Sequence, residues 1–322
     1  MAISGCQTHA VQSKLSVSTA FFSPNGWAVA VLVSSIFSGS LVAQSLPGTH
    51  TESRAEELLE KHASLAGQLA TNSYARPLVL ESSETSSMVN GNAYAVLDAP
   101  FSTVGATLKS PKRWCDVMIL HINTKYCRAA SDTSQSALDV YVGKKSAQAL
   151  ADAFALAFAF RVVPSGPDFL FVQLTADKGP LGTSNYRIEL RAVPLPEGKT
   201  FMHLRYSYAY GLAGRLAMQT YLATVASDKV GFTQIGQGPK PIYVTGMRGT
   251  VERNTMRYYL AIDAYLASLS APPAQQLNLR LERWFDATEH YPLQLHEVDR
   301  DSYLSMKKIE YQRQLTTSGS PG

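Results

Sequence analysis

Residues Ala151–Val163, ADAFALAFAFRVV, alternate large and small apolar side chains without interruption. A repeat of two residues is the period of a β-strand, whose successive side chains point to opposite faces of the sheet. The large side chains would share one face: Phe154, Leu156, Phe158, Phe160 and Val162. The alanines between them would share the other. Because both faces are apolar, we expect both to be covered.

Three more strand-like segments follow, FLFVQLT, NYRIELRAV and FMHLRYSYAY, and turn sequences such as PSGPD and PLPEG separate them. Residues 186–192 in the middle segment alternate apolar and charged side chains, which predicts one buried and one wet face. Short connections join consecutive strands, so we expect an antiparallel meander. An earlier segment, GNAYAVLDAP, also alternates like a strand.

Segments with a helical period lie on both sides of these strands. Thr51 can cap a helix that runs to Ala70, and two short helices are expected at FSTVGATLK and KRWCDVMIL. Four more helices are expected after the meander, at Gly214–Ala226, Val251–Leu269, Leu277–Ala287 and Asp299–Gln314. The combination predicts an α+β fold.

The first 45 residues are typical of an export signal rather than of the fold. Trp27–Ala43 is an apolar run broken by small polar residues, and cleavage after Ala43 or after Ser45 fits the small residues found there. We expect a cleaved signal and an exported, periplasmic protein. The alternatives are an uncleaved membrane anchor and a buried helix, although the run is shorter than the ~20 apolar residues of a spanning helix.

Three cysteines occur in the chain, and Cys6 would leave with the signal. Cys115 and Cys127 would remain, and a lone pair close in sequence usually forms a disulfide in an oxidising compartment. A metal site would need further ligands at suitable spacing, and no CxxC or HxxxH accompanies them. Asp116 would disfavour a catalytic thiolate at Cys115, although His121 lies nearby in sequence. We therefore predict a disulfide, no metal and no cofactor.

The charge balance excludes one class of partner. The formal net charge is only +4 and no run of Lys or Arg is present, so we expect no nucleic-acid binding. The weak basic excess is compatible with attraction to an anionic membrane surface. Nothing in the sequence indicates an oligomeric state.

One polar group stands out within the long segment after residue 245. Arg248, Glu252, Arg253, Asn254 and Arg257 precede Tyr258 and Tyr259 at helical spacing. They would form an ion-pair network that fixes this helix to the sheet. In the alternative, an Arg and a Tyr hold a lipid headgroup or a carboxylate at the mouth of a cavity, a task that suits bidentate arginine.

The order of elements around Tyr94–Met118, YAVLDAPFSTVGATLKSPKRWCDVM, carries a resemblance. A strand leads into a helix at the PF pair, and a second short helix opens near a proline and bears Trp114. With the meander and a long helix behind it, this order resembles the helix-grip fold of START-like lipid-transfer and polyketide-cyclase-like (SRPBCC) proteins, over roughly Leu78–Ala226. The later stretch GMRGTVERNTMRYYLAIDAYL resembles a signature of uncharacterised bacterial proteins.

The resemblance implies a curved antiparallel sheet around a long helix, with extra C-terminal helices. It divides the chain into an export signal (1–45), an N-terminal helical segment (46–77), a START-like domain (78–240), a helical extension (241–314) and a flexible tail (315–322). Proteins of the family usually end with the helix that closes the cavity, whereas further helices follow in this chain. The resemblance therefore does not determine which helix closes the cavity.

The resemblance also implies an internal tunnel for one apolar small molecule or lipid. The candidate ligand-binding residues are Phe154, Phe158, Phe160, Tyr206, Tyr208, Met218, Tyr221, Arg253, Arg257 and Tyr259. For each apolar residue taken singly, filling a dry core is favoured over contacting a ligand. We expect a binding or transfer protein without catalysis. The alternatives are a cyclase- or hydrolase-like enzyme on the same scaffold, and an envelope interaction protein whose tunnel is collapsed.

Overall fold

The computed structural model describes residues 47–131, 136–224, 228–236, 238 and 240–317. The chain divides into two units, Met1–Gln44 and Ser45–Gly322, and the fold described below belongs to the second. The predicted export signal lies outside the described residues, and so do the last five residues of the tail. Within the described residues, no helix is both long and apolar enough to span a membrane.

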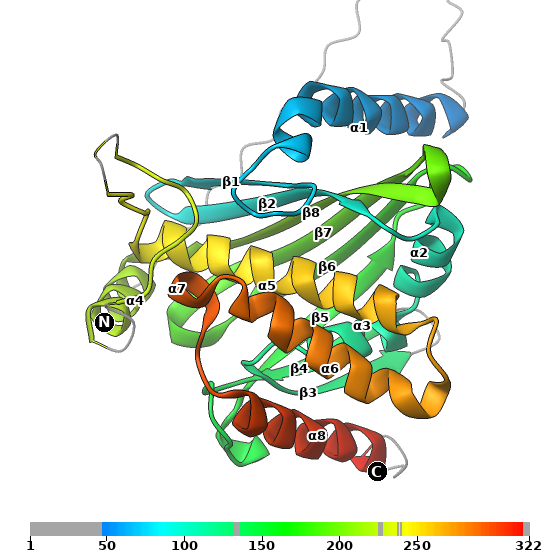
Figure 1. Ribbon diagram of the computed structural model, residues 1–322. Coiled ribbons are helices and arrows are strands. Elements are labelled where there is room, and N and C mark those ends of the chain that lie inside the picture. The colour runs from blue at the N-terminus through cyan, green and yellow to red at the C-terminus, as the bar shows by residue number, and fades with distance from the viewer. Residues whose placement is uncertain (1–46, 132–135, 225–227, 237, 239, 318–322) are drawn as a thin grey trace, which may run out of the picture. The chain divides into compact units, whose positions relative to one another are not determined.

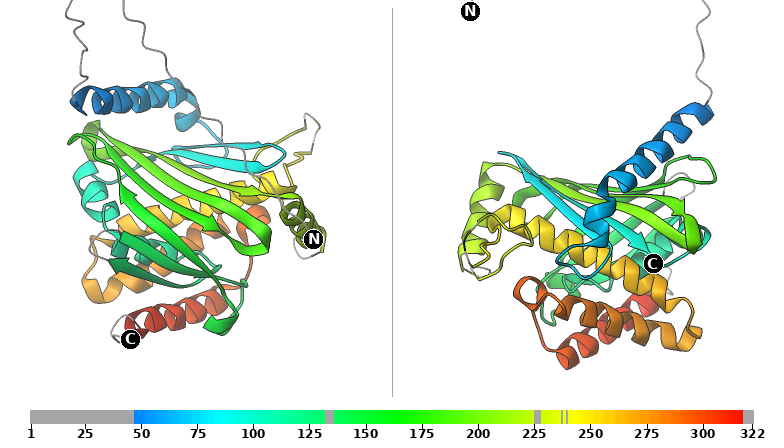
Figure 2. Two further views of the ribbon diagram at one scale, coloured as in Figure 1. Left: turned by 180° about the vertical axis from the view of Figure 1, so that it is seen from behind. Right: turned by 45° about the horizontal axis from the view of Figure 1, so that its top comes forward.

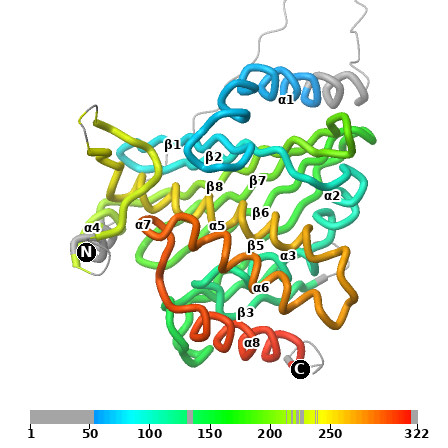
Figure 3. Tube along the Cα trace, in the orientation of Figure 1, coloured from blue at the N-terminus to red at the C-terminus, as the bar shows by residue number. Residues whose placement is uncertain are grey.

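The second unit is built on one eight-stranded antiparallel sheet. Its strands are β1 (Leu78–Glu84), β2 (Met88–Leu97), β3 (Thr124–Ser131), β4 (Ser136–Val142), β5 (Phe154–Val162), β6 (Leu170–Lys178), β7 (Thr183–Leu195) and β8 (Lys199–Tyr210). Their order is β1-β2-β8-β7-β6-β5-β4-β3. The chain therefore runs from β3 to β8 one strand at a time, as Figure 3 shows, and the predicted meander is confirmed.

Eight α-helices accompany the sheet in the described residues. They are α1 (Pro47–Ala70), α2 (Phe101–Leu108), α3 (Pro111–Met118), α4 (Leu212–Thr224), α5 (Gly246–Ser268), α6 (Pro273–Glu289), α7 (Pro292–Leu295) and α8 (Arg300–Thr317). α2 and α3 connect β2, which lies next to the edge strand β1, to β3 at the opposite edge of the sheet.

The helix that packs across the inner face of the sheet is α5. It contacts β1, β2 and β8 on one side and α6 on the other (Figure 1). Close approach to β2 requires Gly91, because a Cβ there would overlap the Thr255 hydroxyl and lie 3.2 Å from the Val251 carbonyl oxygen. The curved sheet with a long helix on its inner face confirms the predicted helix-grip fold. That helix belongs to the segment 241–314, so the expected division at residue 240 falls between the sheet and the helix packed on it.

The outer face of the sheet is only partly covered. α1 packs there through Leu58, Leu65 and Leu69 against Phe171 and Phe201, and Figure 2 shows α1 and α5 on opposite faces. α1 does not extend over the alanine face of β5, whose alanines at 155, 157 and 159 are exposed. The expectation that both faces of β5 are covered was therefore wrong, because apolar alternation does not specify how far the next layer reaches.

Strand β1 was not predicted from the sequence. Its first three residues are buried, but its second half is polar because it lies at the edge of the sheet. Ser82 in that half donates a hydrogen bond to Glu252 of α5, so its polar side chain has a partner inside the fold.

The predicted disulfide is present between Cys115 of α3 and Cys127 of β3, with the two Cα atoms 5.2 Å apart. It closes a loop of 12 residues in sequence separation and ties the short helix to the edge strand that follows it. Trp114 beside it is fully buried, and its Nε1 donates to the Leu108 carbonyl at 2.8 Å. This window is a packing and cross-linking element.

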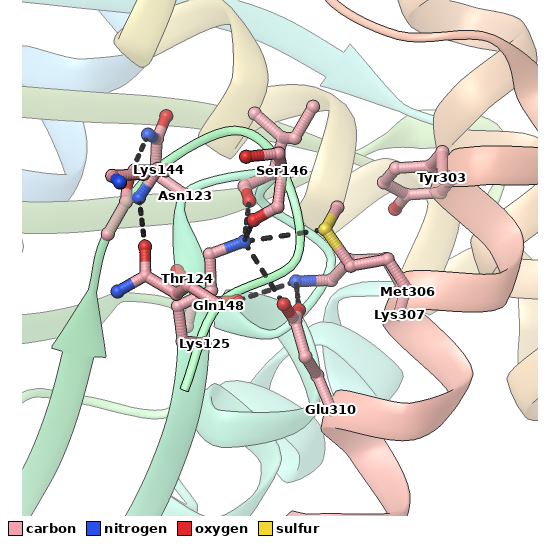
Figure 4. A network of polar contacts seen from close by, with 12 residues as sticks. Asn123, Thr124, Lys125, Lys144, Ser146, Gln148, Tyr303, Met306, Lys307 and Glu310 are labelled. Atoms are coloured by element: carbon pink, nitrogen blue, oxygen red, sulfur yellow. Dashed lines mark hydrogen bonds and ion pairs between the residues drawn. The ribbon is translucent and has the colours of Figure 1, made fainter. Parts of the chain in front are cut away.

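A buried cluster of charges attaches α8 to β3 (Figure 4). Glu310 accepts from Lys125 Nζ at 3.0 Å through one oxygen and from Lys307 Nζ at 2.6 Å through the other. Both lysine side chains have no exposed surface, and they also donate to backbone carbonyls, including those of Ile122 and Thr124. Hydrogen bonds of this kind are what permit charged groups to be buried.

Candidate functional site

Four tyrosines meet between the inner face of the sheet and α5. Tyr186 of β7 stacks on Tyr208 of β8 at 5.2 Å between ring centroids, and Tyr206 lies 6.2 Å from Tyr186. Tyr258 reaches them from α5, with its ring 5.4 Å from that of Tyr206. The strands position three of these rings because alternate residues of β7 and β8 face the same side.

A histidine and an asparagine complete the group, which we name the tyrosine cluster: His121, Tyr186, Tyr206, Tyr208, Asn254 and Tyr258. His121 follows α3 in the chain, and its ring lies 5.0 Å from the Tyr258 ring. The Asn254 side chain, one turn before Tyr258 on α5, interacts with both His121 and the Tyr206 hydroxyl. Asn254 and Tyr258 retain intermediate exposure, whereas the other members are buried.

The titratable groups of the tyrosine cluster are neutral near pH 7. Burial, followed by the nearby charges of Arg257 and Lys307, lowers the pKa of His121 well below its usual value. Burial raises the pKa of Tyr186 to about 12 and that of Tyr206 well above its usual value. Both effects are the expected result of desolvation, which disfavours the charged form.

Two polar atoms in the cluster have no hydrogen-bond partner among the described residues, His121 Nε2 and the Tyr208 hydroxyl. His121 Nδ1 accepts the backbone N–H of Asn123 at 3.2 Å, so the neutral imidazole carries its proton on Nε2. The Asn254 amide lies beside the His121 ring, so the Tyr208 hydroxyl is the clearer of the two buried groups without a partner. Such groups are rare in folded proteins, and each indicates a ligand, a water molecule or strain.

The structure brings together part of the predicted ligand-binding set. Phe158, Phe160, Tyr206 and Tyr208 are all buried in the core on the inner face. Phe154 lies at the start of β5 and is 40% exposed. Met218 and Tyr221 lie on α4, and the arrangement of their side chains lies outside what the structure describes.

The orientation of α5 separates Tyr258 from Tyr259. Tyr258 faces the tyrosine cluster, whereas Tyr259 is buried beside Arg76, which pairs with Asp263 at 2.8 Å. Tyr259 is the tyrosine of this pair that was predicted for the ligand site, and Tyr258 was not in that set. The signal that could have identified it is the spacing of four residues between Asn254 and Tyr258, which puts both side chains on one face of a helix.

The two predicted arginines are engaged in contacts that hold neighbouring segments to α5. Arg253 donates to the Val230 carbonyl at 3.1 Å. Arg257 pairs with Glu297 at 2.6 Å, in the segment between α7 and α8. These contacts agree with the first of the two interpretations of this charged group, in which it fixes the helix.

Glu252 is the centre of the same charged group and is fully buried. Its Oε2 accepts the backbone N–H groups of Phe232 and Thr233 at 2.6 and 2.9 Å. Its Oε1 accepts the Thr233 hydroxyl at 2.6 Å and the Ser82 hydroxyl, with Arg248 Nε at 3.9 Å. One carboxylate therefore joins α5, the loop at residues 230–234 and the edge strand β1.

Within the described residues, no three His, Cys, Asp or Glu side chains converge as a set of metal ligands.

Comparisons with known proteins gave structural likenesses alone. No protein-family model and no curated protein matches the chain. A conserved protein from Geobacillus kaustophilus is 14% identical with a TM-score of 0.32, over 55% of this chain and 95% of its own. Truncated norcoclaurine synthase from Thalictrum flavum is 13% identical with a TM-score of 0.32, over 45% and 91%. Human StAR-related lipid transfer protein 5 is 11% identical with a TM-score of 0.30, over 56% and 92%. Likenesses of this size carry no information on what the chain binds.

Proposed function

We propose that this protein binds one apolar ligand between the inner face of the sheet and α5, with a neutral polar group of the ligand at the tyrosine cluster. The observation that carries the proposal is the Tyr208 hydroxyl, which is buried without a hydrogen-bond partner in the cluster that also holds the neutral His121 imidazole. Leaving such a group unpaired costs about 1–3 kcal/mol, and a ligand oxygen that accepts from it would recover that cost.

The chemistry of the cluster selects the ligand class. Because the imidazole and the tyrosine hydroxyls are neutral near pH 7, they suit a hydroxyl or carbonyl oxygen better than a carboxylate. The buried rings of Phe158 and Phe160 on the same face of the sheet would contact an apolar body. We therefore expect a neutral lipid or a polyketide-like molecule rather than a free fatty acid.

Access to the cluster would come from the side of α5. Asn254 and Tyr258 are its two members with intermediate exposure, and they lie one helical turn apart. The Tyr258 ring lies against both His121 and Tyr206, so a ligand that enters here would turn that ring aside.

The test is to purify the protein under native conditions, extract it with organic solvent and identify small molecules by mass spectrometry. We expect a stoichiometric neutral ligand. Tyr208→Phe should reduce its retention about fivefold to tenfold, the equivalent of one hydrogen bond. Tyr126→Phe is the matched control, because Tyr126 also has a buried hydroxyl without a partner but lies on β3, against Tyr141.

Two outcomes would overturn the proposal: repeated absence of any ligand from native extracts, or equal retention by the wild type and Tyr208→Phe. The first would favour the collapsed-interior alternative. The enzyme alternative stays a prediction, and chemical conversion of the extracted ligand by fresh protein would support it.

We also propose that the protein is exported. The supporting observation is the disulfide between Cys115 and Cys127, because such bonds persist in oxidising compartments. Intact mass of the protein expressed with its own N-terminus should show a chain beginning at Gln44 or Leu46. A chain that keeps Met1 and sediments with membranes would favour the anchor, and one that keeps Met1 in the cytosol would refute export.

A further inference from the structure

The outer face of the sheet carries a polar recess that the proposed function does not use. It has a volume of about 270 Å³ and is lined by side chains of β1, β2, β7 and β8. The residues that matter are Asn90, Asn92, Glu189, Arg191, His203 and Arg205; we name this site the outer recess. Strand register explains their convergence, because Asn92 pairs with Arg205, Arg205 with Glu189, and Arg191 with His203.

The polar side chains of the outer recess are held in place by one another. Arg205 Nη2 donates to Asn90 Oδ1 at 2.8 Å, and His203 Nε2 bonds Asn92 Oδ1 at 2.9 Å. The Tyr94 ring stacks on the His203 ring at 4.3 Å and an angle of 11°. Asn90 Nδ2 also donates to Ser83 Oγ at 3.5 Å. Since both amide oxygens are occupied, the groups left to meet a ligand are the Asn92 amide nitrogen, the second N–H of the Asn90 amide and the remaining guanidinium N–H groups.

The outer recess has a net excess of one positive charge. Glu189 lies in it but is engaged by Gln173 at 3.1 Å and by Arg191 at 3.7 Å. Lys61 of α1 adds a third cation at the rim, 4.6 Å above the Tyr94 ring and paired with Glu81. Three cations thus face two carboxylates. Burial and then the charges of Arg191, Arg205 and Lys61 lower the pKa of His203 to about 3, so the imidazole stays neutral.

We infer that the outer recess binds a phosphoryl group. Two guanidinium groups and two amide groups converge from different strands, and this supplies more donors than the two oxygens of a carboxylate can accept. The recess has room for a phosphoryl group that is carried by a larger molecule. Two sources fit, the headgroup of an anionic lipid and a soluble phosphate ester. The inference is independent of the inner-face proposal.

The first experiment is a titration of the protein with inorganic phosphate. Binding is measured by NMR, from the changes in the chemical shifts of the protein, and by calorimetry. We expect saturable binding that weakens with added salt. Arg205→Gln should weaken it at least about tenfold, because it removes a forked charged donor. Arg161→Gln is the matched control, since Arg161 is an exposed arginine of β5 on the same face, and it should change binding less than about twofold.

A second variant keeps the inference testable if Arg205→Gln does not fold. Asn92→Ala removes an amide donor without changing the charge and should weaken phosphate binding by about threefold to tenfold. Absence of saturable binding, or equal loss in Arg205→Gln and Arg161→Gln, would overturn the inference.

Vesicle sedimentation identifies the source of the phosphoryl group. Phosphatidylcholine vesicles with and without phosphatidic acid would be compared, with inorganic phosphate as competitor. Binding that requires phosphatidic acid, is lost in Arg205→Gln and is competed by phosphate supports a lipid headgroup. Phosphate binding without vesicle binding supports a soluble phosphate ester.

Discussion

Replacing Glu310 by glutamine would leave two buried lysines without their shared carboxylate. Lys125 Nζ lies 3.0 Å from one Glu310 oxygen and Lys307 Nζ lies 2.6 Å from the other, and neither lysine side chain is exposed (Figure 4). Burial lowers the pKa of both lysines, and that of Lys307 to about 8, in spite of the nearby carboxylate. Desolvation therefore already outweighs the attraction of Glu310.

The size of the effect follows from two limits. Removing one partner of a buried ion pair costs about 3–5 kcal/mol of unfolding free energy. A buried lysine can also lose its proton, and at pH 7 this costs at most about 5 kcal/mol for a group whose ordinary pKa is near 10.5. Backbone carbonyls of Ser146 and Thr124 remain as acceptors for the two lysines. We expect a loss of about 3 kcal/mol at pH 7.

The loss should shrink as the pH rises. A folded-state pKa below the unfolded value means that the unfolded chain binds more protons, so stability rises with pH through that window. For Lys307 in the wild type the window lies between about 8 and 10.5. Without Glu310 the folded-state pKa values of Lys125 and Lys307 fall further. The pH range over which the unfolding free energy rises then begins at a lower pH. The destabilisation should then decrease by up to about 1.4 kcal/mol per pH unit for each lysine that becomes neutral.

The assay is urea unfolding followed by circular dichroism at pH 7 and pH 9.5, below the ionisation of most tyrosines. Glu60→Gln is the control, because Glu60 is exposed on α1 and the substitution changes the net charge equally. A loss below about 1 kcal/mol at pH 7, or a loss of the same size at both pH values, would refute the argument that the destabilisation comes from desolvated lysines without a carboxylate partner.

Two further predictions concern the links that hold α3 and α5. Reducing the Cys115–Cys127 disulfide, or replacing both cysteines by serine, should lower the unfolding free energy by about 3 kcal/mol, the chain-entropy value for a loop of this length; a thermal melt unchanged by reductant would contradict this. Glu252→Gln should cost about 2–4 kcal/mol in urea unfolding, because an amide cannot replace a carboxylate that accepts from Ser82 and from the backbone and hydroxyl of Thr233. Ser82→Ala should cost less than half as much, and equal costs would argue against a central role for the carboxylate.

Local periodicity accounts for the part of the fold that could be predicted. The alternation in β5 to β8 and the short turns between them predicted the meander, since strand pairing follows from adjacency when connections are short. It also put Tyr206 and Tyr208 on one face of their strand and Tyr186 on the apolar face of the preceding strand, and all three are buried. The disulfide followed from the number of cysteines and the expected compartment.

Other features depended on contacts between distant parts of the chain. α4 and α5 are both helices with apolar residues, and only their packing shows that α5 lies across the sheet. Lys125 is a charged residue that periodicity would place at a surface, yet its partner Glu310 lies 185 residues away.

The sequence by itself determined the strand meander, the cross-link and the inner-facing tyrosines of β7 and β8, because each depends on neighbours within a few residues or on one adjacent strand. Only the tertiary structure decided the rotation of α5 that brings Tyr258 to His121, and the convergence of four strands at the outer recess. Both depend on side chains that meet through packing and register between elements. The spacing of residues along one segment does not determine which side chains of other segments they will contact.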